Sequence, residues 1–295
     1  MRKKLLIGIL AAALVVVAVP GVYIAQLLWR HDVFKTPTYD PAPVALPDLG
    51  PAPRVLLFTK TNGYRHIEGI PASIAMFEGL AKELGWSLYH TEDAGVHTPE
   101  NLAQFDLLVW SNVSGDVLTE DQRAAFRGYI EGGGEVLGIH ATGGDPSYVW
   151  PWYPQEFIRA QFRGHPGFPQ FQQADVVVED RDHPAMKHLD ERWKFRDELY
   201  SFVASPRERV HVLASLDEST YSPNLVGPFG SLSMGDHPII WWHELGEGTV
   251  FYSALGHLPE TYSNPEYREV LKQACLWLMQ RGAAKPAPEE APAAN

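Results

Sequence analysis

Apolar residues along this chain occur in short runs that alternate with longer amphipathic segments. The short runs are mostly continuous, which is typical of strands that are buried on both faces of a sheet. They predict strands at residues 54–59, 86–90, 105–110 and 135–139. Apolar side chains at helical spacing predict helices at 70–84 and 119–131. Because strands and helices alternate with short connections, we expect an α/β fold with a parallel sheet covered by helices.

The second half of the chain is less regular. Residues 145–205 are rich in aromatic side chains, proline and histidine. Further apolar runs predict strands at 210–214, 238–242 and 248–253, followed by an amphipathic helix at 265–280. Residues 54–281 are therefore predicted to form one large α/β domain, or one such domain with an elaboration.

The N-terminus is predicted to be a membrane anchor, residues 1–30. A basic cluster at Arg2 to Lys4 precedes a stretch from Leu5 to Leu28 without a charged side chain, which is long enough to span a bilayer as a helix. The stretch is longer than the core of most cleaved signal peptides and ends without a clear cleavage site, so an uncleaved signal anchor is favoured over a cleaved signal. The basic cluster favours a cytoplasmic N-terminus, which places the domain in the periplasm or at the cell surface.

The segments on either side of the domain are predicted to be irregular. Residues 31–53 contain six prolines and indicate an extended linker, and residues 282–295 indicate a disordered tail of alanine, proline and glutamate. The formal net charge is −12 although the anchor region is basic, and no basic stripe is present, which argues against nucleic acid as a partner. The single cysteine, Cys275, falls on the apolar face of the last helix and is predicted to be a core residue.

Polar candidates for chemistry follow the predicted strands. In an open parallel sheet, ligands bind beyond the carboxyl ends of the strands. His66, His140 and His257 each follow a separate predicted strand, and Glu198 is a fourth candidate. His165 and His183 each precede a proline and are predicted to be turn residues. A lone histidine at a strand end is often only structural, so spacing alone leaves both interpretations open.

His140 stands in the most informative local pattern. Gly138-Ile-His140 at a strand end, followed by small residues, has the layout of a nucleophile elbow, a sharp turn that presents one side chain. The presented side chain is an imidazole, which can act as an acid, a base or a metal ligand near neutral pH. The chain contains no zinc-binding motif and no phosphate-binding glycine loop.

Six short motifs together resemble the ThuA-like (trehalose utilisation) family. In chain order they are Tyr-Arg-His, Gly-Gly-Gly-x-x-x-Gly-Ile-His, Asp-His-Pro, Asp-Glu-Leu-Tyr, His-Pro-x-x-Trp and Gly-x-Gly-x-Val-Phe-Tyr-x-x-Leu-Gly-His, and they extend over residues 53–281. The resemblance implies a flavodoxin-like three-layer sandwich related to class I glutamine amidotransferases. His140 stands where those enzymes carry the catalytic cysteine, so cysteine-based glutamine hydrolysis is not expected.

The resemblance also implies a pocket and a substrate class. It identifies His66, His140, Glu198 and His257 as pocket residues, with Tyr64 and Arg65 beside them. The family is linked to sugar metabolism, especially to oxidised (3-keto) disaccharides, which implies a small-molecule sugar as substrate.

Two functional hypotheses follow. In the first, the protein is a carbohydrate-active enzyme in which His140 is the base or acid, Glu198 its partner, and His66 and His257 polarise the substrate. A divalent transition metal held by these four residues is a variant of this hypothesis. Trp150 and Trp152, with Tyr153, would form a sugar-stacking wall, unless they only pack in a loop.

In the second hypothesis, the domain is a non-catalytic carbohydrate-binding or scaffolding module with a degenerate amidotransferase fold. The membrane anchor and the acidic domain fit both hypotheses. The sequence predicts no particular oligomeric state.

Overall fold

A computed structural model of the chain describes residues 21–22, 25–26, 28–226 and 229–284. Within these residues, nine strands form one sheet in the order β2-β1-β3-β4-β13-β12-β9-β6-β7. The first five strands of this order pair in parallel. They are β2 (Ser87–Thr91), β1 (Arg54–Phe58), β3 (Leu107–Ser111), β4 (Glu135–Ile139) and β13 (Gly248–Ser253).

The other four strands pair in antiparallel fashion. They are β12 (Pro238–Leu245), β9 (His211–Leu216), β6 (Phe171–Val178) and β7 (Arg192–Glu198). Of the nine strands in this sheet, only β12 and β6 run against the common direction. An α/β fold with a large, mostly parallel central sheet is therefore confirmed, whereas β6 and β7 arise from the segment in which the sequence showed no regular period.

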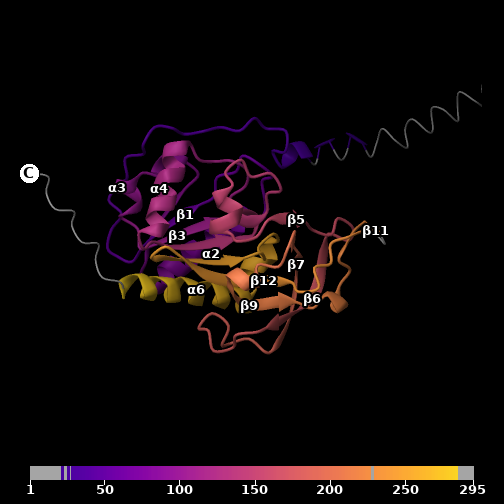
Figure 1. The fold of residues 1–295 in the computed structure, drawn as a ribbon. Helices are drawn as coiled ribbons and strands as arrows, with labels where there is room; N and C mark the ends of the chain where they lie inside the picture. Colours follow the sequence, from indigo (N-terminus) through magenta and orange to yellow (C-terminus); the bar gives the residue numbers. More distant parts are fainter. Residues whose placement is uncertain (1–20, 23–24, 27, 227–228, 285–295) are drawn as a thin grey trace, which may run out of the picture.

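Helices lie on both faces of the sheet, with α3 and α4 on one side and α6 on the other (Figure 1). The long helices agree with the predicted ones at 70–84, 119–131 and 265–280. The helices are α2 (Gly69–Leu84), α3 (Pro99–Leu102), α4 (Glu120–Glu131), α5 (Pro259–Ser263) and α6 (Pro265–Ala283). Thr119 and Gln122 begin α4 with a reciprocal capping box, and Gly85 ends α2 in the left-handed conformation.

Smaller elements complete the fold around the sheet. Two short hairpin-like pairs join β5 (Phe162–Gly164) to β8 (Ser201–Phe202) and β10 (Asn224–Val226) to β11 (Phe229–Ser231). Single helical turns lie at Ala94–Val96, His140–Gly143, Tyr153–Phe157, Arg207–Arg209 and Glu218–Thr220.

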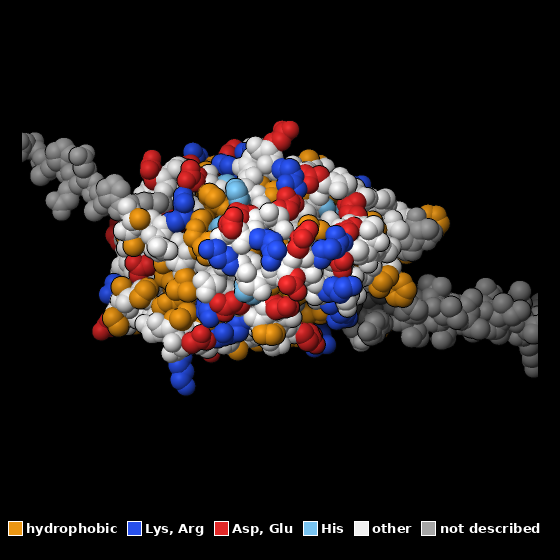
Figure 2. Space-filling view, turned by 90° about the horizontal axis from the view of Figure 1, so that it is seen from below, with side chains coloured by type: hydrophobic (Ala, Val, Ile, Leu, Met, Phe, Trp, Pro, Cys, Tyr) orange, Lys and Arg blue, Asp and Glu red, His pale blue; other side chains and the backbone are white. Residues whose placement is uncertain are grey.

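The core follows the apolar runs of the sequence. Strands β3 and β4 are buried along their whole length, between helices on the two faces. Cys275 is fully buried in α6, and burial raises the pKa of its thiol, in agreement with a core position. On the face of the molecule that carries α6, lysine and arginine side chains are interspersed with aspartate and glutamate (Figure 2).

The segment before β1 packs along the domain. Residues 35–53 contain no helix or strand and run past α3 and α4 (Figure 1). The Nζ atom of Lys60 lies 2.6 Å from a carboxylate oxygen of Asp40. Val44 donates its N–H to the carbonyl of Gly95 and accepts the side-chain amide of Asn101. These contacts attach the proline-rich segment to the surface of the domain.

The predicted anchor and tail fall largely outside the described residues. Residues 1–20, 23–24 and 27 of the predicted anchor are not described, nor are residues 285–295 of the predicted tail. Among the helices that the structure does describe, none is both long enough and apolar enough to cross a membrane.

Candidate active site

Four side chains that the sequence singled out meet at one end of the sheet. His66 follows β1, His140 follows β4, His257 follows β13, and Glu198 is the last residue of β7. One nitrogen of each imidazole and one carboxylate oxygen of Glu198 all lie within 4.8 Å of one another. These four residues are called the His3Glu cluster below. Residues from four strands therefore form one compact polar group.

His140 is presented by a sharp turn, as the elbow pattern predicts. Its φ of 51° lies in the left-handed region, directly after the last residue of β4. Its Nδ1 atom lies 2.7 Å from the carbonyl oxygen of Ala254, so the N–H at Nδ1 donates a hydrogen bond to that oxygen. Nδ1 then carries the hydrogen of the neutral ring, and Nε2 presents a lone pair to the cluster. The ring of Tyr200 stacks on the imidazole, with centroids 4.2 Å apart.

Glu198 is bound through both of its oxygens. Oε2 lies 3.0 Å from Nδ1 of His257 and 3.4 Å from Nε2 of His140. Oε1 accepts the side-chain amide of Gln170 at 2.5 Å and lies 3.2 Å from Nδ1 of His165. Burial alone would raise the pKa of Glu198, but the contacts with His140 and His257 outweigh burial and hold this pKa well below its usual value. Glu198 is therefore a carboxylate at neutral pH although its side chain is only 2% exposed.

His66 completes the cluster as a neutral imidazole. Its ring centroid lies 4.8 Å from that of His140 and 4.5 Å from that of His257. Burial lowers the pKa of His66 well below its usual value, and the two neighbouring imidazoles lower it further. The buried Nδ1 atom has no hydrogen-bond partner among the residues that the structure describes. A neutral imidazole with unused hydrogen-bonding capacity is suited to metal binding or to a proton transfer.

Asp197 positions the turn that carries His257. Its carboxylate is fully buried and accepts hydrogen bonds from the N–H groups of Gly256, His257 and Leu258, at 2.7, 3.2 and 3.3 Å. The hydroxyl of Thr261 is a further donor, at 3.1 Å. Burial raises the pKa of Asp197. Through these bonds the end of β7 is connected to the loop after β13, although the two strands are far apart in the order of the sheet.

Glycine at position 256 allows the strand ends to approach. Gly256 has a φ of 135°, which L side chains rarely adopt. An added Cβ there would lie 2.8 Å from a side-chain carbon of Ile139 and 3.1 Å from Cβ of His140. Any larger residue at this position would push the loop of His257 away from His140.

Three members of the cluster, His66, Glu198 and His257, line a cavity of about 560 Å³, whereas His140 is fully buried and is not part of its wall. Tyr64 is part of the cavity wall, and burial together with Glu198 and Glu68 raises the pKa of this phenol to about 12. Tyr64 therefore stays protonated and can donate a hydrogen bond. Polar side chains on the wall beyond the cluster are Asn62, Ser114, Asp116, Asp145, Ser147 and His165.

Comparison with known proteins identifies the family. The family model described as "ThuA: Trehalose utilisation" matches residues 54–278, which is most of the chain. The chain belongs to the ThuA family. Among curated proteins, none matches the chain.

Solved structures agree with this assignment of the ThuA domain. A ThuA-like protein from Bacteroides uniformis is 25% identical, with a TM-score of 0.67, over 80% of this chain and 94% of that one. A ThuA-like protein from Parabacteroides merdae is 16% identical, with a TM-score of 0.58, over 80% of this chain and 93% of that one. At 16% identity, the similarity to the Parabacteroides merdae protein shows a shared fold alone. The glutamine amidotransferase-like architecture expected from the motifs is consistent with both.

Three other residues that were predicted to contact the substrate lie elsewhere. The guanidinium of Arg65 is paired with the carboxylate of Glu92, with N–O distances of 2.7 and 3.1 Å, and Arg65 is not part of the cavity wall. Trp150 and Trp152 stack on each other 4.6 Å apart, and Trp152 also packs against Phe157. The structure therefore does not bring these three side chains to the His3Glu cluster.

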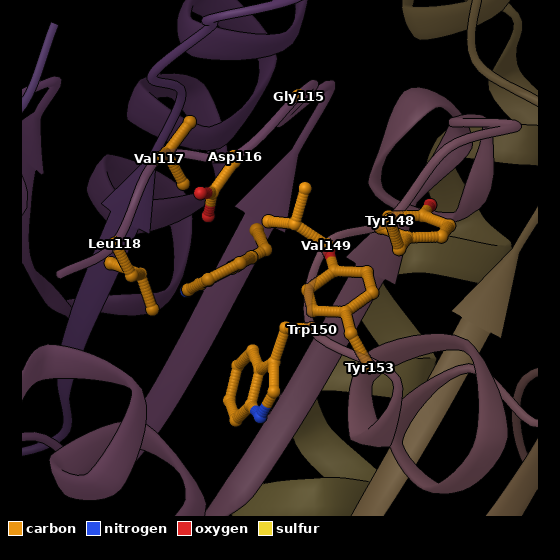
Figure 3. Close-up of a pocket in the computed structure, with 9 residues that line it drawn as sticks. Gly115, Asp116, Val117, Leu118, Tyr148, Val149, Trp150 and Tyr153 are labelled. Atoms are coloured by element: carbon orange, nitrogen blue, oxygen red, sulfur yellow. The ribbon is translucent and has the colours of Figure 1, made fainter. Parts of the chain in front are cut away.

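Trp150 instead forms part of a neighbouring, smaller pocket. Asp116, Val117 and Leu118 lie on one side of this pocket, and Tyr148 and Trp150 lie on the other (Figure 3). Tyr153, the third residue of the predicted sugar-stacking wall, also lines this smaller pocket. The packed-loop interpretation describes these aromatic side chains better than a wall beside the histidines.

Sequence reasoning missed several residues that contact the cluster. His165 was predicted to be only a turn residue, yet its ring approaches Glu198, and Gln170 and Asp197 were not considered at all. Asp197 stands next to Glu198 within the Asp-Glu-Leu-Tyr motif, so its position was a usable signal. Gln170 carries no local signal, because its contact depends on how the loop before β6 folds over the end of β7.

Proposed function

We propose that this protein is a metal-dependent enzyme of the ThuA family that acts on carbohydrates through histidine and carboxylate chemistry. The observation that carries the proposal is the contact between Nε2 of His140 and Oε2 of Glu198, two acceptor atoms 3.4 Å apart. A bound cation satisfies both atoms, as does a proton on Nε2 of His140 or on Nδ1 of His257. Two acceptors aimed at one buried point are typical of a metal site.

The distances fit a divalent transition metal. A tetrahedral ion with bonds of about 2.0–2.1 Å places its ligand atoms about 3.3–3.4 Å apart. The atoms of His140, His257 and Glu198 are separated by 3.0, 3.3 and 3.4 Å, which fits such an ion. With His66 included, the four ligand atoms lie within 4.8 Å of one another, so the bound ion would draw His66 closer. Three imidazoles and one carboxylate form a donor set that suits zinc or a similar ion.

The surrounding groups support the same proposal. Metal-binding histidines usually donate their second ring nitrogen to a carbonyl or a carboxylate, as His140 does to Ala254. The free oxygen of Glu198 is held by Gln170, and the backbone of His257 is held by Asp197. Each of these contacts fixes the orientation of a proposed ligand before the ion binds.

The residues beside the cluster are suited to moving protons. A bound ion would polarise a carbonyl or hydroxyl oxygen of the substrate. His165 then lies next to the reacting group, with its ring against Glu198 and its side chain 33% exposed to the cavity. We assign His165 as the general acid or base in the metal-bound form, while His140 and Glu198 take these roles if no metal binds. Tyr64, on the same wall, donates a hydrogen bond to the substrate.

A carbohydrate is the substrate class that the cavity favours. The wall offers amide, hydroxyl and carboxylate groups that match the hydroxyls of a sugar, and the volume lies within the usual range for small-molecule sites. The family description, trehalose utilisation, points in the same direction. A 3-keto-glycoside would suit the chemistry, because its ketone acidifies the neighbouring C–H that a base removes. Anchoring of the domain outside the cytoplasm is part of the same proposal and places this reaction at the cell envelope.

The test is turnover of 3-keto-glycosides by the purified protein. We expect turnover that EDTA abolishes and added zinc, cobalt or manganese restores, and that His140→Ala removes. Sugar binding without turnover, in the presence of each metal, would contradict the enzyme and favour a non-catalytic binding module.

A further inference from the structure

Residues 28–33, which precede the proline-rich segment, form part of the wall of the active-site cavity. Leu28 and Val33 line the same cavity as His66, Glu198 and His257. In Figure 1 this segment is the short indigo turn at the end of the molecule where β5 lies. Phe162, the first residue of β5, also lines the cavity. A segment from before the family domain therefore contributes to its site.

Specific contacts hold this segment against the catalytic loop. Arg65 donates its N–H to the carbonyl of His31, and Nδ1 of His31 donates to the carbonyl of Arg65, both at 2.8 Å. The ring of His31 stacks on that of Tyr64, with centroids 4.5 Å apart and planes within 11°. The neighbour of Arg65 and Tyr64 in this loop is His66, so the wall is attached to the loop that carries a member of the cluster.

The cavity has a polar, buried inner end, and its more exposed wall carries an apolar strip beside Asp145 and Ser147. The His3Glu cluster is almost entirely buried, whereas Val33 is 41% exposed and Leu28 is partly exposed. Pro146 and Phe162 extend the apolar part of the wall. A ligand that extends from the cluster to the opening therefore contacts polar groups at its inner end and the side chains of Leu28 and Val33 at its outer end.

Apart from the His3Glu cluster and His165, the described wall of the cavity provides no side chain that would pair with an anionic ligand. Among the described residues that line it, none is a lysine or an arginine, while Asp116, Asp145 and Glu198 are acidic. Arg65, in the adjoining loop, is paired with Glu92. A phosphate or carboxylate placed away from the cluster would meet the wall that carries Asp116 and Asp145, which holds no lysine or arginine among the described residues.

We propose that the site takes an uncharged glycoside whose non-sugar part is apolar, with the sugar at the His3Glu cluster and the apolar part against Leu28 and Val33. This inference rests on the proposed carbohydrate function and adds to it the class of glycoside. Burial of hydrocarbon against these two side chains provides the additional affinity, because apolar surface leaves water.

The experiment compares methyl glucoside with octyl glucoside on the full-length, zinc-loaded protein, by calorimetry below the micelle concentration of the octyl compound. We expect octyl glucoside to bind at least tenfold more tightly than methyl glucoside. Val33→Ser and Leu28→Ser should each reduce this ratio about threefold or more. Phe34→Ser is the matched control, because Phe34 is 60% exposed and does not line the cavity, and it should leave the ratio unchanged. On the metal-free protein, where no zinc ion can bind the phosphate, glucose 6-phosphate should bind no more tightly than glucose.

The outcomes separate this inference from the proposed function. Equal binding of the methyl and octyl compounds overturns the apolar wall and leaves the carbohydrate function standing. The apolar wall is also overturned if both serine variants keep the wild-type ratio of octyl to methyl glucoside affinity. The same holds if Phe34→Ser lowers this ratio as much as the two cavity variants do. If glucose 6-phosphate binds the metal-free protein more tightly than glucose does, the inference that the substrate is uncharged is overturned. If no glucoside binds, and no 3-keto-glycoside is turned over, the proposed function fails as well.

Discussion

The Nε2 atom of His140 faces the Oε2 atom of Glu198 at 3.4 Å, in the buried interior beside the cavity. Because Nδ1 of His140 is engaged by the carbonyl of Ala254, the nitrogen that faces Glu198 is an acceptor in the neutral ring. A cation held between the two atoms satisfies both of them, and so does a proton shared with His257 or carried by Nε2 of His140. This relationship is the reason for preferring a metal-binding site over a packed cluster of polar side chains.

Substitution of the carboxylate should weaken metal binding strongly. Glu198→Gln keeps the size of the side chain but removes the negative charge that balances the ion, so we expect zinc affinity to fall at least 100-fold. Competition with a coloured chelator measures this affinity. Glu92→Gln is the matched control, since Glu92 pairs with Arg65 outside the cavity, and it should leave zinc affinity unchanged.

Asp197 should act on the site through position alone. Asp197→Asn replaces one of two acceptor oxygens by an NH2 group, which cannot accept the N–H groups that this oxygen binds in the turn at His257. Loss of such supporting contacts typically lowers metal affinity about 10- to 100-fold. We expect this loss together with a decrease of about 1–3 kcal/mol in the free energy of unfolding. Unchanged zinc affinity in a destabilised variant would show that Asp197 only stabilises the fold.

Acid should destabilise the domain through buried histidines. Burial lowers the pKa of His97 from 6.5 to about 4. Above pH 6.5, His97 is neutral in both the folded and the unfolded chain, so it does not lower the free energy of unfolding. Below pH 6.5, the unfolded chain binds a proton at His97 that the folded chain does not bind. Stability is therefore lost as the pH falls from 6.5 towards 4, by about 3 kcal/mol for this residue.

Denaturant unfolding at several pH values checks the contribution of His97. His97→Phe, which fits the surrounding cluster of Phe58, Trp110 and Phe126, should make the decrease in stability below pH 6.5 less steep. Phe105→Leu, a core change without a titrating group, should lower stability equally at every pH. If the free energy of unfolding of His97→Phe falls with pH as steeply as that of the wild type, His97 is not the source of the acid sensitivity.

The tryptophans near residue 150 should matter for stability rather than for the substrate. Trp152→Ala removes a ring that packs on Trp150 and Phe157, so we expect a loss of about 3 kcal/mol or more in the free energy of unfolding. Sugar binding should remain within twofold of the wild type. Tyr64→Phe should show the opposite pattern, with weaker sugar binding and nearly unchanged stability, because the lost hydroxyl lies on the cavity wall.

The sequence predicted the parallel half of the sheet and the histidines that follow its strands. This was possible because a buried strand needs a continuous apolar run, and because parallel strands bring their carboxyl ends to one edge. His66, His140 and His257 could be placed together for that reason alone. The turn at His140 was visible in the glycine two residues before it.

The antiparallel half could not be predicted in the same way. Strands β6 and β7 have mixed apolar and polar positions, and their pairing is set by tertiary contacts rather than by a local period. The position of Glu198 was inferred from a family motif, and the reason for it is the bonding of Asp197 to the loop after β13. His165 and Gln170 reach Glu198 only through the fold of an irregular loop. The same difficulty explains why Trp150 and Trp152 could not be placed relative to the histidines from the sequence.

Metal content is the most direct measurement of the central claim. The purified protein, stripped with a chelator and dialysed against zinc or cobalt, should retain about one ion per chain, and His66→Ala, His140→Ala and His257→Ala should each retain much less while remaining folded. Retention of no ion by the wild-type protein would contradict the account. Equal retention by the wild type and the three alanine variants would contradict it as well, since the ion would then bind elsewhere.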